Sequence, residues 1–154
     1  MVRRGTYALI MSLPRASKIR IGALGTFDFR RGHYVYIGSA LNGLDARIAR
    51  HLTGVPWREL PPEWQSGEIG GRLSRGRPKR FFWHIDYFLP HAQILQVWTD
   101  AGGVRLECEW ARTLLALPNA RVVAPRFGAS DCHCAAHLVC LDRSPAPDES
   151  DNEA

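Results

Sequence analysis

The sequence predicts a small α/β domain of the α+β type, in which helices flank a mainly antiparallel central sheet. Residues 6–13 and 33–38 alternate their apolar side chains between two faces, as strands do. Residues 44–52 and 105–117 instead repeat their apolar side chains at the interval of three to four residues that is typical of a helix. A chain of 154 residues suits a single hydrophobic core.

The first half of the chain is expected to hold three strands and a helix. The strand over 6–13 ends at Pro14, because proline cannot continue a ladder of backbone hydrogen bonds. A short strand over 18–23 and the strand over 33–38 should complete an antiparallel meander. The helix over 44–52 follows the turn signal Asn42-Gly43.

The second half begins with residues 53–80, which are rich in Gly, Pro, Trp and Arg and lack a sustained period. Such a stretch indicates a long loop. The expected elements after it are a short helix over 83–89, a strand over 93–99, a helix over 105–117 ended by Pro118, and a last strand over 121–124. We expect residues 1–141 to form the folded domain and residues 142–154, which are polar and acidic, to form a disordered tail.

Composition narrows the class of protein. The chain is 45% hydrophobic and 23% charged, which excludes a disordered chain. No apolar run approaches the ~18 residues of a membrane helix, and the N-terminal residues lack a secretory apolar segment. We therefore expect a cytoplasmic protein whose four cysteines are reduced thiols or metal ligands.

The folded part is strongly basic. Residues 142–154 hold one of the 20 basic and five of the 15 acidic residues, so residues 1–141 carry 19 basic against 10 acidic groups. Such an excess, mostly of arginine, suits nucleic acid, although it could also reflect genome composition and solubility. Within the loop, five cations lie beside the aromatic residues 81–83 and are the candidate DNA-binding residues: Arg72, Arg75, Arg77, Lys79 and Arg80.

Several stretches, in order, resemble motifs of one nuclease superfamily. Gly5-Thr6-Tyr7 and Tyr36-Ile37-Gly38, followed by Arg47 and His51, are similar to the motifs of the GIY-YIG nucleases. The resemblance is closer to the Uri-type branch of that superfamily. Its pattern corresponds to residues 5–7, 34–40, 83–87, 107–109 and 127–134 of this chain.

The resemblance implies a GIY-YIG-like fold and an endonuclease that hydrolyses DNA phosphodiester bonds with Mg²⁺ or Mn²⁺. It implies catalytic roles for Tyr7, Tyr36, Arg47, His51 and His84, and a metal-binding carboxylate within residues 107–109. Ser130 and Asp131 would close the active site in the role of an asparagine found in other members, and Asn119 is a second candidate for that role.

The chemistry of these residues supports the same roles. Arg47 is permanently charged and can stabilise a phosphorane with two hydrogen bonds, although a lone helical arginine is more often a surface residue. A tyrosine with a pKa near ~10 is a poor base unless cations lower that pKa, and Tyr7 and Tyr36 could instead simply pack on the sheet. His84 could assist proton transfer or be a hydrogen-bonded core residue.

The helix over 105–117 offers two carboxylates, and its pattern favours one of them as the metal ligand. Positions three, four, seven and eight after Glu107 are apolar, so Glu107 should lie at the edge of the buried face. Glu109 shares its face with Arg112, Thr113 and Ala116. One carboxylate with waters and a phosphate oxygen is a usual magnesium arrangement. The alternative is that either glutamate serves only the helix dipole.

A cluster of soft ligands lies near the end of the domain. Cys132, Cys134, His137 and Cys140 follow one another within nine residues and are a candidate zinc set. The short spacing is atypical of zinc sites, and buried thiols are the usual alternative. Two other functions therefore stay open: a nucleic-acid-binding module that does not cleave, and a zinc-stabilised interaction domain.

Overall fold

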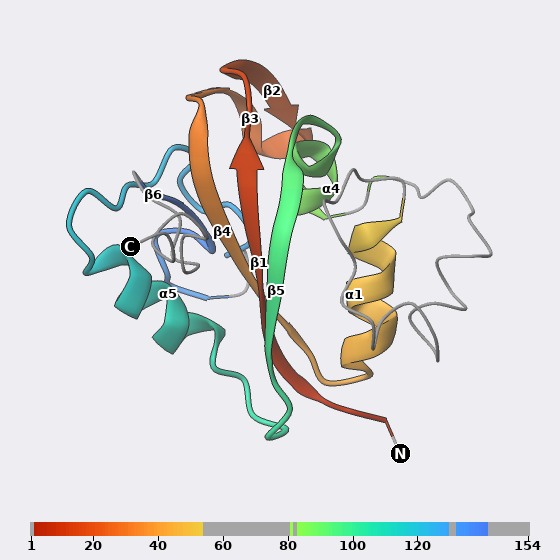
Figure 1. Cartoon of the computed structure of the whole chain (residues 1–154). Helices are drawn as coiled ribbons and strands as arrows, with labels where there is room; N and C mark the ends of the chain where they lie inside the picture. Colours follow the sequence, from red (N-terminus) through yellow and green to blue (C-terminus); the bar gives the residue numbers. More distant parts are fainter. Residues whose placement is uncertain (1, 54–80, 82, 130–131, 142–154) are drawn as a thin grey trace, which may run out of the picture.

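The computed structural model describes residues 2–53, 81, 83–129 and 132–141, and confirms a mixed domain with a central antiparallel sheet (Figure 1). The four-stranded sheet has the order β5-β1-β4-β6, and β2 and β3 form a separate two-stranded sheet. The strands are β1 (Gly5–Leu13), β2 (Ser17–Ile21), β3 (Gly25–Phe29), β4 (Gly32–Ala40), β5 (Gln93–Asp100) and β6 (Leu138–Leu141). The helices are α1 (Leu44–Leu52), α4 (His84–Phe88) and α5 (Glu107–Leu115), with 3-10 turns at Gly22–Leu24 and Leu89–His91.

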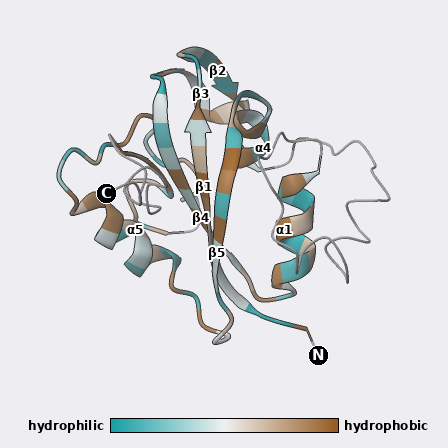
Figure 2. Ribbon diagram, viewed as in Figure 1, coloured by the Kyte–Doolittle hydropathy of each residue, from teal (hydrophilic) through white to brown (hydrophobic). Residues whose placement is uncertain are grey.

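The inner strands of the central sheet, β1 and β4, are buried on both faces. Tyr7, Leu9 and Met11 of β1 point into one apolar cluster, which also includes residues of α1 and α4. Ala8 and Ile10 point into a second cluster, which α5 covers. Figure 1 shows α1 and α5 on opposite sides of the sheet. Figure 2 shows hydrophilic and hydrophobic residues alternating along α1, as expected for a helix with one buried face.

The predicted meander of three strands was wrong in its pairing. β1 pairs directly with β4, with Tyr7 opposite Gly38, and β2 pairs with β3, which the sequence did not predict. β3 has only five residues, and its alternate positions Thr26 and Asp28 are exposed. It therefore has too few apolar residues for a strand pattern to be recognised in the sequence. The β2–β3 hairpin packs on α4, because Ile19 and Ile21 of β2 join the same apolar cluster as Phe88.

The last predicted strand was also misplaced. Of residues 121–124, Arg121 makes an isolated bridge to Cys140, and the strand that extends the sheet is β6, which pairs with β4. The predicted helices over 44–52, 83–89 and 105–117 and the strand over 93–99 are confirmed within a few residues at their ends.

Some predictions concern residues outside the described ranges. These are most of the loop over 53–80 with its candidate DNA-binding cations, the pair Ser130 and Asp131, and the acidic tail 142–154. Among the described helices, none has the length and apolar character needed to cross a membrane.

Candidate functional site

A cavity of about 710 Å³ lies where the start of β1 and the end of β4 meet the first turns of α1 and α5. Seven residues that the sequence singled out line it: Tyr7, Tyr36, Arg47, His84, Glu107, Cys132 and His137. Other residues of the lining were not predicted from the sequence, among them Trp83, Arg105 and Cys108. Strands therefore supply the two tyrosines, and helices on opposite faces of the sheet supply Arg47 and Glu107.

Tyr7 is the buried centre of the site. Its hydroxyl lies 2.6 Å from Nε2 of His51, which is itself fully buried on α1. His51 thus stands behind Tyr7. Burial raises the pKa of Tyr7 well above its usual value, Tyr36 raises it further, and the nearby Arg47 acts in the opposite direction. At neutral pH the Tyr7 hydroxyl is therefore protonated, and it shares one hydrogen bond with Nε2 of His51.

The β1–β4 register explains why glycine stands opposite Tyr7. A Cβ atom added at Gly38 would lie 2.5 Å from the Tyr7 hydroxyl oxygen and 2.6 Å from its ring. This is closer than atoms that are not bonded can approach, so the tyrosine ring occupies the space that a side chain at 38 would fill.

Tyr36 packs beside Tyr7, with ring centroids 6.3 Å apart, and its ring also meets His51 and Phe127. Burial raises the pKa of Tyr36 to about 12, although the charge of Arg47 acts to lower it. Neither tyrosine is thus ionised at neutral pH in the protein as it stands. Burial outweighs the effect of the neighbouring cation at both positions.

Trp83 organises the two arginines of α1. The guanidinium groups of Arg47 and Arg50 each lie 4.3 Å from the centroid of the Trp83 ring. Asp86, which is fully buried, accepts two hydrogen bonds from Arg50, at 2.7 and 3.0 Å, and one from the backbone N–H of Trp83. Arg47 donates a long hydrogen bond of 3.4 Å to the carbonyl of Ser39.

These contacts assign different work to the two arginines. The bidentate pair with Asp86 fixes Arg50 between α1 and α4. Arg47 lines the cavity and faces the tyrosines. The ion pair of Arg50 and Asp86 also holds Trp83 in place beneath Arg47.

The glutamates of α5 separate as the helical pattern predicts. Glu107 is half-buried and lines the cavity, and its charge raises the pKa of both tyrosines. Glu109 is exposed and does not belong to the cavity lining. Arg105, which is exposed just before α5, adds a second cation to the lining.

His84 is the first residue of α4 and lines the cavity. Its Nδ1 accepts a hydrogen bond of 2.9 Å from the backbone N–H of Gly128. This bond places the proton of the neutral ring on Nε2. Partial burial lowers the pKa of His84, which favours that neutral form.

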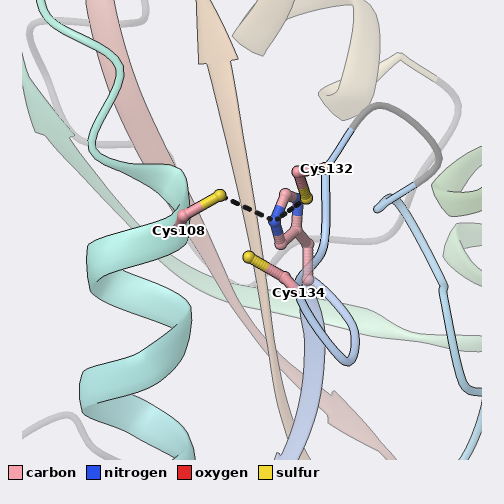
Figure 3. Close-up of side chains that lie close together, drawn as sticks. Cys108, Cys132 and Cys134 are labelled. Atoms are coloured by element: carbon pink, nitrogen blue, oxygen red, sulfur yellow. Dashed lines mark hydrogen bonds between the residues drawn. The ribbon is translucent and has the colours of Figure 1, made fainter.

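A cluster of three cysteines and one histidine adjoins the cavity. One ligand atom from each of Cys108, Cys132, Cys134 and His137 lies within 4.8 Å of every other. Nε2 of His137 lies 3.5 Å from the sulfur of Cys132 and 3.9 Å from that of Cys108 (Figure 3). Such a set could hold a metal ion such as zinc.

The predicted zinc set was therefore wrong in one member. Cys140 lies on β6 opposite Tyr34, and the alternation of that strand turns its side chain into the apolar core. Cys108 on α5 takes its place, 24 positions before Cys132 in the chain. The set of Cys132, Cys134 and His137 lacks a fourth ligand. A cysteine in the first turn of a predicted helix was the signal that could have indicated Cys108 as that ligand.

Comparison with known proteins places this site within one family. The family model described as "Domain of unknown function DUF123" matches residues 6–154. The chain belongs to the DUF123 family. The match spans the lining residues and the Cys/His cluster of this DUF123 domain. Searches of curated proteins and of solved structures returned no match.

The cavity of the DUF123 domain thus combines two kinds of side chain: the Cys/His ligands of the cluster and cationic arginines. Cys108, Cys132 and His137 line the same cavity as Tyr7 and Arg47. Burial, together with the neighbouring thiols, raises the pKa of Cys134 to about 12, and burial lowers the pKa of His137. Without a cation, Cys134 and His137 are therefore neutral at physiological pH. The same cavity is also lined by Arg47 and Arg105, whose charges suit an anion.

Proposed function

We propose that this DUF123 domain is a metal-dependent endonuclease that hydrolyses phosphodiester bonds in DNA. One observation carries the proposal: Tyr7, Tyr36, Arg47 and Glu107, which come from four separate elements, line one cavity, with His51 bonded behind Tyr7. The resemblance of the same residues to GIY-YIG nucleases of the Uri type supports it.

The arginines of the cavity supply the anion-binding part of this function. Arg47 and Arg105 carry permanent charge, and a guanidinium can grip two oxygens of one phosphate. Trp83 limits the motion of Arg47 by stacking on its guanidinium. Arg47 is thus positioned in advance for the extra charge that develops on the phosphoryl oxygens in the transition state.

Tyr7 and His51 supply a route for the proton of the attacking water. The neutral Tyr7 hydroxyl accepts a proton from the water as it passes its own proton to Nε2 of His51, 2.6 Å away. This exchange never requires a free tyrosinate, so the raised pKa of Tyr7 is no obstacle. The role resembles the activation of a nucleophile by an adjacent histidine.

Glu107 fits a hard divalent cation. Among the described residues that line the cavity, Glu107 is the one with a carboxylate. The nearby carboxylate of Asp86 is instead paired with Arg50. Mg²⁺ is commonly bound through one or two carboxylates together with waters and phosphate oxygens. When bound to Glu107, Mg²⁺ or Mn²⁺ would act as a Lewis acid on the phosphate.

The basic excess of residues 1–141 supports DNA as the substrate. The candidate DNA-binding cations at positions 72–80 would bind backbone phosphates. Affinity would then come mainly from these cations, and cleavage from the cavity.

The test is a cleavage assay on duplex, branched, flapped and single-stranded DNA, with and without Mg²⁺ or Mn²⁺. Arg47→Ala should lower the cleavage rate by ~100-fold or more while DNA affinity changes little, because the lost stabilisation belongs to the transition state. Glu107→Gln should abolish the metal-dependent rate, since a neutral amide is a weak ligand for Mg²⁺.

Glu109→Gln is the matched control, because it makes the same change two positions away on the exposed face of α5. It should cut like the wild type. If the wild type binds DNA but cuts none of these substrates with either metal, the nuclease proposal is wrong and the domain is a nucleic-acid-binding module.

A further inference from the structure

We propose that Cys108, Cys132, Cys134 and His137 bind one Zn²⁺ ion, and that this ion fixes the wall of the cavity that carries Glu107. The first part depends only on the four ligands. The second part rests on the proposed function, because it assigns a use to Glu107.

The spacing of the ligand atoms fits a single tetrahedral ion. With Zn–S bonds of about 2.3 Å and Zn–N bonds of about 2.0–2.1 Å, the ligand atoms of a tetrahedral site lie roughly 3.5–3.8 Å apart. The two measured separations from Nε2 of His137 are 3.5 and 3.9 Å, and all four atoms lie within 4.8 Å of one another. A modest inward shift of the ligand atoms would complete the tetrahedron.

The ligands converge from two parts of the chain. Figure 3 shows Cys108 projecting from α5 toward Cys132 and Cys134 on the facing segment. His137 is 3% exposed, and its Nε2 meets two sulfur atoms. A polar imidazole among three thiols packs poorly as part of a hydrophobic core. Thiolate and imidazole are, in contrast, the preferred ligands of zinc.

The ligand set is complete, which assigns the ion a structural role. Structural zinc sites have four protein ligands, whereas catalytic sites keep one position open for water or substrate. Zinc at this cluster would therefore not carry out the hydrolysis. That role stays with Glu107 and its hard cation.

The cluster is linked directly to the cavity. Glu107 immediately precedes Cys108 in the first turn of α5. His137 is tied to the central sheet, because its carbonyl accepts a hydrogen bond of 3.0 Å from Ile37 of β4, and its N–H donates one of 2.7 Å to Phe127. An ion shared by Cys108 and His137 would thus fix the start of α5, including Glu107, relative to β4.

Metal content of the purified full chain tests the first part. We expect roughly one zinc per chain by elemental analysis, and less than about a tenth of that in Cys108→Ala or Cys134→Ala. Cys140→Ala is the matched control, since it removes the fourth cysteine of the chain from the core instead of the cluster, and it should keep its zinc. Zinc that is absent from the wild type, or retained in Cys108→Ala, would overturn the proposal.

A second measurement avoids variants that fail to fold. Metal-stripped wild type is titrated with Co²⁺ alone, which reports its ligands by visible absorption. We expect the thiolate-to-cobalt charge-transfer band and the intense bands of tetrahedral geometry, saturating at one equivalent and removed by Zn²⁺. Weak octahedral bands without a thiolate contribution would contradict a Cys₃His site.

The link to Glu107 is tested on DNA cleavage with Mg²⁺ held constant. Removing zinc with a chelator selective for it should reduce cleavage at least about tenfold, and adding Zn²⁺ should restore it. In a separate Mg²⁺ titration, the concentration for half-maximal rate should rise in the stripped protein, because Glu107 loses its fixed position. An unchanged Mg²⁺ dependence would disprove this link. Stoichiometric zinc in a protein that cuts no DNA would instead disprove the nuclease and leave the zinc site standing.

Discussion

The pair Tyr7 and His51 shows how burial defines the chemistry of a single residue. Removing the Tyr7 hydroxyl from water raises its pKa, and Arg47 offsets only part of that effect. A tyrosinate is therefore not the resting state. The short bond to His51 offers the alternative of a neutral tyrosine that exchanges one proton for another.

Tyr7→Phe should separate this role from packing. The variant keeps the ring but removes the hydroxyl that bonds to Nε2 of the buried His51, which should lower the free energy of unfolding by about 1–3 kcal/mol. Cleavage should fall at least ~100-fold, while DNA binding stays near that of the wild type.

Tyr34→Phe is the control for that substitution. Tyr34 lies buried on β4, and its hydroxyl donates to the carbonyl of Arg30, away from the cavity. It should lose a similar amount of stability in denaturant unfolding but keep its cleavage rate. Equal losses of activity in the two variants would assign Tyr7 a purely structural role.

Individual site residues were predictable where one local pattern was sufficient. The helical period separated Glu107 from Glu109, and the motif spacing selected Arg47. Trp83 and Arg105 were missed because their part in the cavity depends on how α4 and α5 approach the sheet. Cys108 was missed for the same reason, since ligands 24 positions apart meet only after folding.

At the scale of elements, the close pairing of β1 with β4 sets the position of Tyr7. Gly38→Ala should push the Tyr7 ring away from its place, because the new methyl group would overlap the hydroxyl and the ring. Overpacking of this kind costs about 1–3 kcal/mol, and cleavage should fall together with stability.

A double-mutant cycle with Tyr7→Phe checks the cause. Part of the overlap is with the Tyr7 hydroxyl, so Gly38→Ala should cost less stability when combined with Tyr7→Phe than in the wild type. Additive free energies of unfolding would show that Gly38 is needed for another reason.

The elements themselves were predicted well where one strand or helix carries its own pattern. β1, β4 and α1 have clear periods of two or of three to four residues, and their predicted ends lie close to the observed ones. β3 was missed, and β6 was assigned to residues 121–124 instead. Both are short, and strand pairing rather than a local pattern decides which segment extends a sheet.

At the scale of the whole molecule, the site depends on both layers that cover the sheet. α1 packs on one face and brings Arg47 and His51, whereas α5 packs on the other face and brings Glu107 and Cys108. The two apolar clusters must both form before the cavity exists. Activity and global folding should therefore be lost together under denaturing conditions.

Alkaline pH provides such a condition, because three buried tyrosines resist ionisation in the fold. Burial raises the pKa of Tyr7 and Tyr34, and that of Tyr36 to about 12. Below pH ~10, the folded and unfolded chains both keep these protons, so the tyrosines do not affect stability. Above pH ~10 the unfolded chain releases its protons first, and the free energy of unfolding falls as pH rises.

Each pKa unit corresponds to about 1.4 kcal/mol, so Tyr36 alone should lower the free energy of unfolding by ~2 kcal/mol at pH 12, and Tyr7 and Tyr34 should add to that loss. A titration that follows tyrosinate absorbance and far-ultraviolet circular dichroism together should show most tyrosines ionising in the same step as unfolding. Tyr34→Phe and Tyr36→Phe should each make the free energy of unfolding fall less steeply with pH above pH ~10. If instead the tyrosines ionise near pH ~10 while the fold persists, then the Tyr7 hydroxyl is accessible to hydroxide, and a free tyrosinate replaces the proton exchange with His51.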